Sequence, residues 1–212
     1  MKVARISIGQ GQFKGRSIPL PPAVSGHRHF TPSLLKEAAF QLLENTITPG
    51  AFWDLCSGSG QMGLEALSRG YDPVHLVELD RSRFQWLKNR VCPDFSVTLH
   101  NKDFLRLAPI LAGQQQNTVC FIDLPYSFWK KDRTCEKLES FMGNLRRSQE
   151  DRVLPYILVQ APCLWKIGSE EISQWIQKAF DLQQRDYRGQ HLILLSPVRT
   201  ESNSTGADSA DP

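Results

Sequence analysis

Four consecutive residues at the end of an apolar run have the right types to hold an amine for reaction. They are Asp123-Leu124-Pro125-Tyr126, and residues 119–122 before them are typical of a buried strand. Strands of open α/β sheets end at the edge where these folds bind ligands. The Asp123 carboxylate and the backbone carbonyl after it would accept both N–H bonds of a nucleobase amine and localise its lone pair. Tyr126 would stack on the base, which must be unpaired or extruded from a helix. We therefore expect a catalytic corner formed by Asp123, Leu124, Pro125 and Tyr126.

A glycine turn between another apolar strand and a helix is the second candidate site. Its residues are Asp54-Leu55-Cys56-Ser57-Gly58-Ser59-Gly60. Glycines let the backbone pass close to a ligand where a Cβ would collide. We expect cofactor contacts from four of these residues, namely Asp54, Cys56, Gly58 and Gly60.

Glu78 follows the glycine turn by about 20 residues, the spacing of an acid that accepts hydrogen bonds from a ribose diol. Gly58, Gly60 and Gly63 also satisfy the dinucleotide pattern Gly-x-Gly-x-x-Gly, so a nicotinamide or flavin cofactor stays open on this motif alone. The amine corner, however, has no role in an oxidoreductase. The Asp-x-Pro-Tyr corner resembles the one with which amino-directed methyltransferases hold a nucleobase, and this resemblance, together with the glycine turn, implies S-adenosylmethionine as the cofactor.

The rest of the chain must place these two motifs at one edge of a sheet. A β-hairpin is expected from residues 3–8 and 13–20, and a helix is expected to begin with Thr31 as N-cap and Pro32 in its first turn. Strands are expected at 51–55, 73–78, 96–100, 119–123 and 155–160, helices at 63–69, 81–91, 104–111, 132–145 and 172–178, and a closing antiparallel pair at 180–186 and 191–196. This alternation predicts an α/β fold with a mainly parallel sheet and helices on both faces.

Charge and composition divide the chain into three parts. Residues 1–36 contain six Lys or Arg and no Asp or Glu, whereas the whole chain has a formal net charge of only +3. We expect residues 1–30 to form a basic arm that contacts RNA phosphates through Lys14, Arg16 and Arg28. Lys14 and Arg16 follow a glycine turn, so we expect them to project from the hairpin beside the carboxyl edge of the sheet, near Tyr126. Residues 31–200 would form the catalytic domain. Residues 201–212, which lack a hydrophobic period, would form a disordered tail.

The cysteine pattern and the hydropathy exclude several classes of protein. The five cysteines include no Cys-x-x-Cys pair, so we expect neither a disulfide framework nor a metal site. Cys56 and Cys120 lie in apolar strand contexts, where a thiol acts as a small hydrophobe. No apolar run approaches the ~20 residues of a membrane span. We expect a cytoplasmic monomer that does not bind membranes.

The motifs together resemble those of the RsmD-like bacterial 16S ribosomal RNA (guanine-N2)-methyltransferases, which are class I enzymes with a Rossmann-like fold. The resemblance covers residues 5 to about 195. Besides the two sites, it rests on Gly11-Gln12-Phe13-Lys14-Gly15-Arg16, Lys36-Glu37-Ala38-Ala39-Phe40, Gly63-Leu64-Glu65-Ala66-Leu67-Ser68-Arg69-Gly70 and Val77-Glu78-Leu79-Asp80. It implies methyl transfer from S-adenosylmethionine to the N2 amine of a guanine in 16S rRNA. The implied partner is the small ribosomal subunit or an assembly intermediate of it.

The resemblance also implies a place for the adenine of the cofactor. In methyltransferases an acid after the third strand typically meets the adenine amino group, and Asp103 has this position. Phe104 would pack on the adenine ring. A helix N-cap role for Asp103 is expected equally and is compatible with the first role.

Two departures from the family pattern keep other interpretations open. Leu124 replaces the first proline of Asp-Pro-Pro-Tyr, which removes a locked φ but keeps the carbonyl. Before Thr31 the family has Arg-Pro, where this chain has His29-Phe30. One alternative is therefore a catalytically weakened relative that binds RNA or ribosomes without turnover. The other is an amino methyltransferase that acts on another nucleic acid.

Overall fold

A seven-stranded mixed sheet forms the centre of the protein in the computed structural model, which describes residues 5–21, 31–114, 117–149 and 152–198. The strand order is β5-β4-β3-β6-β7-β9-β8, in which β3 to β7 are parallel and β9 runs antiparallel to both β7 and β8. The strands are β3 (Phe52–Asp54), β4 (Val74–Val77), β5 (Thr98–His100), β6 (Val119–Asp123), β7 (Tyr156–Ala161), β8 (Phe180–Tyr187) and β9 (Gln190–Pro197). The expected parallel sheet with an antiparallel C-terminal pair is confirmed.

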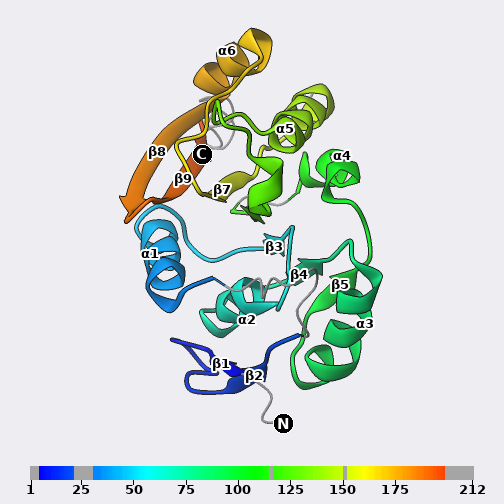
Figure 1. Ribbon diagram of the computed structural model, residues 1–212. Helices are drawn as coiled ribbons and strands as arrows, with labels where there is room; N and C mark the ends of the chain where they lie inside the picture. Colours follow the sequence, from blue (N-terminus) through cyan, green and yellow to red (C-terminus); the bar gives the residue numbers. More distant parts are fainter. Residues whose placement is uncertain (1–4, 22–30, 115–116, 150–151, 199–212) are drawn as a thin grey trace, which may run out of the picture.

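Helices cover both faces of this sheet (Figure 1). The helices are α1 (Ser33–Glu44), α2 (Gln61–Ser68), α3 (Arg81–Arg90), α4 (Ala108–Leu111), α5 (Glu136–Gln149) and α6 (Glu170–Ala179). The first three lie on one side, where α1 and α2 pack on the β3, β6 and β7 side chains that include Phe52, Phe121 and Leu158. The last three pack on the opposite face, against Cys120, Ile122 and the alternate residues of β7. Side chains of successive strand residues point to opposite faces, so each strand contributes to both cores.

The N-terminal hairpin lies outside the main sheet, at the bottom of Figure 1. Its strands, β1 (Arg5–Ser7) and β2 (Ser17–Pro19), are antiparallel. Ile8 and Ile18 are buried against Leu64 of α2 and Leu87 of α3. The hairpin is therefore a further layer on the outer surface of α2 and α3, held in part by apolar packing.

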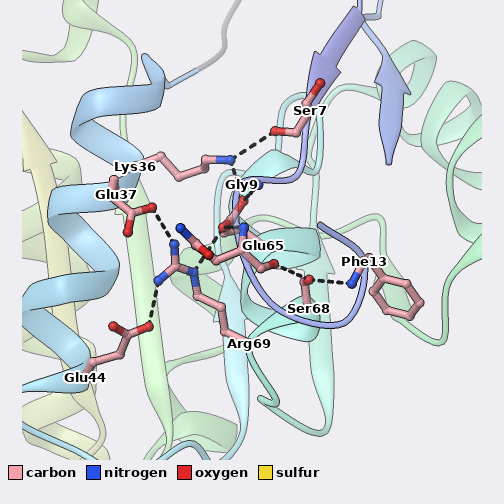
Figure 2. Close-up of polar contacts among 10 residues, drawn as sticks. Ser7, Gly9, Phe13, Lys36, Glu37, Glu44, Glu65, Ser68 and Arg69 are labelled. Carbon is pink, nitrogen blue, oxygen red and sulfur yellow. Dashed lines mark hydrogen bonds and ion pairs between the residues drawn. The ribbon is translucent and has the colours of Figure 1, made fainter. Parts of the chain in front are cut away.

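A buried carboxylate joins this hairpin to α1 and α2 (Figure 2). Glu65 of α2 is 0% exposed and accepts hydrogen bonds from the backbone N–H groups of Gly9 at 2.8 Å and Gln10 at 3.0 Å. It also forms an ion pair with Lys36 of α1, whose Nζ donates to Ser7 O at 3.1 Å. Burial opposes ionisation, but the hydrogen bonds from Gly9 and Lys36 hold the pKa of Glu65 below its ordinary value.

Arg69 extends the same network along α1. Its Nε lies 3.0 Å from Glu65 Oε1, and its two terminal nitrogens lie 2.6 Å from carboxylate oxygens of Glu37 and Glu44. Its guanidinium also lies 4.8 Å from the centre of the Phe40 ring. Residues 63–70, one of the stretches on which the family resemblance rests, thus contribute contacts between α1, α2 and the hairpin.

Several helix starts differ from the sequence expectation, among them that of the helix expected at 104–111, which is a 3₁₀ turn over Phe104–Arg106 followed by α4. Pro32, not Thr31, is the N-cap of α1, and no side chain caps that helix. The helix expected from 132 begins instead at Glu136. Asp132 Oδ1 accepts hydrogen bonds from the Thr134 N–H and hydroxyl, and Arg133 has a φ of 69°, so this segment forms a turn.

Some expectations fall outside the described residues. They are the RNA contact of Arg28 and the disordered tail of residues 201–212. Within the described part of the chain, no helix combines the length and the hydropathy needed to cross a bilayer.

Candidate active site

A cavity of about 810 Å³ lies at the carboxyl ends of the parallel strands. Its walls include the residues that follow β3, β4, β5 and β6, together with the start of α1. The structure therefore brings together both motifs of the sequence. All of the expected cofactor contacts except Gly60 line it, as do all four residues of the catalytic corner.

The glycine turn forms the floor of the cavity between β3 and α2. Gly58 and Gly60 have φ values of 52° and 76°, in the left-handed region that residues with a Cβ rarely adopt. A Cβ on Gly63 would lie 2.2 Å from a Leu76 methyl, so that glycine allows α2 to approach β4. Asp54 Oδ2 accepts a hydrogen bond from Gly63 N at 3.1 Å and thus stabilises the start of the helix.

Glu78 is held beside this turn by two backbone hydrogen bonds. Its Oε2 accepts from Gly58 N at 2.9 Å and its Oε1 from Asp80 N at 2.8 Å. Each carboxylate oxygen has a further lone pair, so both can still accept from a hydroxyl. Burial raises the pKa of Glu78, and the bonds from Asp80 and Gly58 oppose that rise. The Glu78 carboxylate can therefore accept hydrogen bonds from both hydroxyls of a ligand diol.

Asp103 follows β5 and caps the short 3₁₀ turn η2 (Phe104–Arg106). Its carboxylate accepts a hydrogen bond from Leu105 N at 3.1 Å, which confirms the expected N-cap role. The Phe104 ring is nearly buried and lies 5.5 Å, centre to centre, from the Phe141 ring. A contact of Asp103 and Phe104 with adenine stays a prediction.

The expected catalytic corner, residues 123–126, is held in place by the packing around it. Leu124 is buried in the core between the sheet and helices α4 to α6. Pro125 (φ −50°) precedes the 3₁₀ turn η3 (Tyr126–Phe128) as its N-cap. Tyr126 is 66% exposed at the cavity, and its hydroxyl accepts a hydrogen bond from Gln190 Nε2 at 2.6 Å. Core packing of Leu124 thus restrains the corner where the family pattern has a proline.

Of the carboxyl groups that line the cavity, those of Asp54, Glu78 and Asp123 are hard to ionise because they are buried. Burial raises the pKa of Asp54 to about 7, and the nearby Asp123 and Glu78 add to this rise. Burial alone raises the pKa of Asp123 to about 7. The Cys56 thiol has a pKa well above its ordinary value, again through burial, and therefore stays protonated. The cavity therefore suits a reaction in which a carboxylate accepts a proton, and it does not suit one in which a cysteine thiolate attacks the substrate.

The basic hairpin turn lies at the opposite end of the sheet from Tyr126. The turn donates a backbone hydrogen bond at 2.8 Å to the carbonyl of Ser68, the last residue of α2, which starts at the carboxyl end of β3 and runs back from it. The Arg16 guanidinium lies 4.4 Å from the centre of the Phe95 ring, in the loop before β5. The expectation that Lys14 and Arg16 project beside Tyr126 is therefore wrong, because the turn follows the C-terminal end of α2.

Sequence reasoning missed several residues that line the cavity. They are Gln160 at the end of β7, Gln190 at the start of β9, and the basic residues Arg81, Arg83, Lys102 and Lys137. Gln160 had a visible signal, since it is a polar residue at the end of an apolar strand, as Asp123 is. Gln190 had none, because only the antiparallel pairing of β9 with β7 places it there.

Comparisons with known proteins agree with this geometry. The family described as "Conserved hypothetical protein 95" matches residues 6–146. The ribosomal RNA small subunit methyltransferase D of Escherichia coli (strain K12) is 28% identical over 193 residues, which are 88% of this chain and 93% of that protein. The putative rRNA methyltransferase YlbH of Bacillus subtilis (strain 168) is 33% identical over 146 residues, which are 66% of this chain and 76% of that protein.

Solved structures show the same fold at lower identity. The putative methyltransferase yhhF from Escherichia coli has a TM-score of 0.64 and 22% identity, over 92% of this chain and all of that one. The N-terminal domain of human METTL16, solved in complex with SAH, has a TM-score of 0.59 and 14% identity, over 84% of this chain and 75% of that one. The fold is that of class I methyltransferases, and since the family match spans more than half of the chain, this protein belongs to the RsmD-like methyltransferase family.

Proposed function

We propose that this protein transfers a methyl group from S-adenosylmethionine to the N2 amine of a guanine in 16S rRNA. The observation that carries the proposal is that the Asp123 corner and the glycine turn line one cavity. Relatives named as small-subunit rRNA methyltransferases support the RNA substrate. The proposed partner is the small ribosomal subunit or an assembly intermediate.

The chain itself would supply position and electrostatics. S-adenosylmethionine supplies an electrophilic methyl group on a sulfonium. Asp123 and the Leu124 carbonyl would accept the two N–H bonds of the amine, which localises the nitrogen lone pair toward that methyl. The amine would release one proton as it accepts the methyl group, and the Asp123 carboxylate would accept that proton. Tyr126, held by Gln190, would stack on the base and fix its plane.

The direct test is a methylation assay with labelled S-adenosylmethionine and three substrates, namely naked 16S rRNA, an assembly intermediate and the mature small subunit. N2-methylguanosine in the digested RNA is the expected product. RNA binding without methylation of any substrate would instead support the weakened relative, and methylation of another nucleic acid would support the second alternative. The restraint of the corner by buried Leu124 favours turnover.

We expect Glu78→Ala to weaken S-adenosylmethionine binding about tenfold or more, because a buried diol would lose its acceptor. Calorimetry measures the affinity, with NAD as the control ligand. Glu136→Ala, which removes an exposed carboxylate outside the cavity, should leave the affinity unchanged. If the Glu78 variant binds S-adenosylmethionine as tightly as the wild type, Glu78 does not contact the cofactor.

Lys14 and Arg16 are proposed to contact RNA phosphates at a distance from the target base, since their turn lies at the far end of the sheet from the cavity. We expect Lys14→Ala with Arg16→Ala to lower RNA affinity and to reduce its salt dependence by up to about two phosphate contacts. S-adenosylmethionine affinity should not change. The matched control is Lys178→Ala with Arg185→Ala, which removes two other exposed cations. If both double variants show the wild-type salt slope, the hairpin charge is only solvated surface.

A further inference from the structure

Gln160 lies directly beside Asp123 at the edge of the sheet. The two residues are register partners on the parallel strands β7 and β6. Their side chains point to the same face, because Phe121 and Leu158, two residues before each, lie in one core cluster. Gln160 is 7% exposed and lines the same cavity as Asp123 and Tyr126.

The Gln160 side chain carries an unpaired polar atom. Its Oε1 is buried and has no hydrogen-bond partner among the residues that the structure describes. Buried polar groups without partners are rare in folded proteins, because leaving them unpaired costs free energy. Gln160 lines the cavity, and rotation of its terminal amide about χ3, a broad torsion, would bring Oε1 to a polar group of the ligand.

The amide has the chemistry to recognise the rest of a guanine edge. A glutamine offers an acceptor in Oε1 and two donors in Nε2. When the N2 amine of guanine lies at the Asp123 corner, the next groups along its Watson–Crick edge are the N1–H donor and the O6 acceptor. The neighbouring strands lie about 4.8 Å apart, a separation comparable with the length of that edge. Oε1 can then accept from N1–H while Nε2 donates to O6.

We propose that Gln160 is the residue that selects guanine, by reading N1–H and O6 of the extruded base while Asp123 holds N2. This inference rests on the proposed function and deepens it. Adenine presents an acceptor at N1 and cannot donate to Oε1. Enzymes that act on an extruded base commonly read its Watson–Crick edge in this way. Tyr126, fixed by Gln190, keeps the base in the plane that both contacts require.

The test compares two bases in one RNA. The methylated guanosine is first located in the wild-type product, and a second RNA is prepared with 2-aminopurine at that position. 2-Aminopurine keeps the amine but lacks both N1–H and O6. The wild type should methylate guanine with a kcat/KM about 10- to 100-fold higher than 2-aminopurine, the range expected for a good bidentate contact. Gln160→Met should lose most of this preference, with guanine slowed and 2-aminopurine little changed.

Two further measurements separate reading of the base from a structural or cofactor role. Gln160→Met should keep the S-adenosylmethionine affinity and the melting temperature of the wild type. Gln160→Glu, which is nearly isosteric, should also disfavour guanine, because a carboxylate repels O6. Equal slowing of both bases, or unchanged selectivity with weakened cofactor binding, would overturn the assignment of Gln160. A wild type that methylates no guanine would instead refute the proposed function itself.

Discussion

Replacing Asp123 by asparagine is expected to abolish methylation and, at alkaline pH, to make the protein more stable. The activity falls because an amide cannot accept both the hydrogen bond and the proton of the amine, and loss of such a group typically costs roughly a hundredfold or more in rate. The stability rises because burial raises the pKa of Asp123 to about 7, so that its ionised form is unfavourable in the fold. Cofactor affinity should be spared.

The sign of the pH dependence follows from this pKa. The folded carboxyl holds its proton up to about pH 7, whereas the unfolded one releases it near 3.8, so the folded state binds more protons between these values. The free energy of unfolding therefore falls as the pH rises through this window, by on the order of 2–4 kcal/mol for this group. Asp123→Asn removes that loss.

Chemical denaturation at pH 5 and pH 8 checks the stability part of this prediction. At pH 5 the variant should be only modestly more stable than the wild type, because the unfolded wild-type carboxyl is already ionised there while the folded one is still protonated. At pH 8 the advantage of the variant should be clearly larger, because most of the wild-type loss of stability occurs between these two pH values. A variant that is less stable than the wild type at pH 8 would contradict the raised pKa of buried Asp123. A variant that still methylates RNA would exclude Asp123 from the reaction.

The second large effect is expected at Glu65, which anchors the hairpin. Glu65→Ala should lower the free energy of unfolding by about 3–5 kcal/mol, because it leaves the buried Lys36 ammonium without its counter-charge. Two backbone N–H groups of the hairpin would also lose their acceptor. The same denaturation experiment measures this change.

An exposed ion pair of the same protein provides the control. Glu171→Ala breaks the pair with Arg146, both partners of which are exposed, and should leave the free energy of unfolding nearly unchanged, because solvent screens an exposed pair. Restoring neutrality in the double variant Lys36→Met, Glu65→Leu should recover much of the stability lost in Glu65→Ala. A Glu65 variant no weaker than the Glu171 variant would show that the network of Figure 2 does not hold the hairpin.

Local signals in the sequence determined the elements and the two motifs of this protein. The apolar run before Asp123 ends as β6 where it was expected, and the glycine-rich stretch forms the expected turn before a helix, in which Gly58 and Gly60 have positive φ. These features depend on neighbouring residues alone. For this reason the fold class, the corner and the turn can be predicted from the order of the amino acids.

Tertiary structure alone decided which distant residues meet. Register between β6 and β7 puts Gln160 beside Asp123, although the alternation within either strand does not specify it. Hydrogen bonds to Glu65 and to the end of α2 put Lys14 far from the cavity, although its position after a turn was compatible with either edge. Lys36 sits in an apolar helical stripe as a buried cation only because its partner, 29 residues away in the chain, is there to neutralise it. Pairings of this kind depend on packing and charge compensation across the whole fold, which no local pattern encodes.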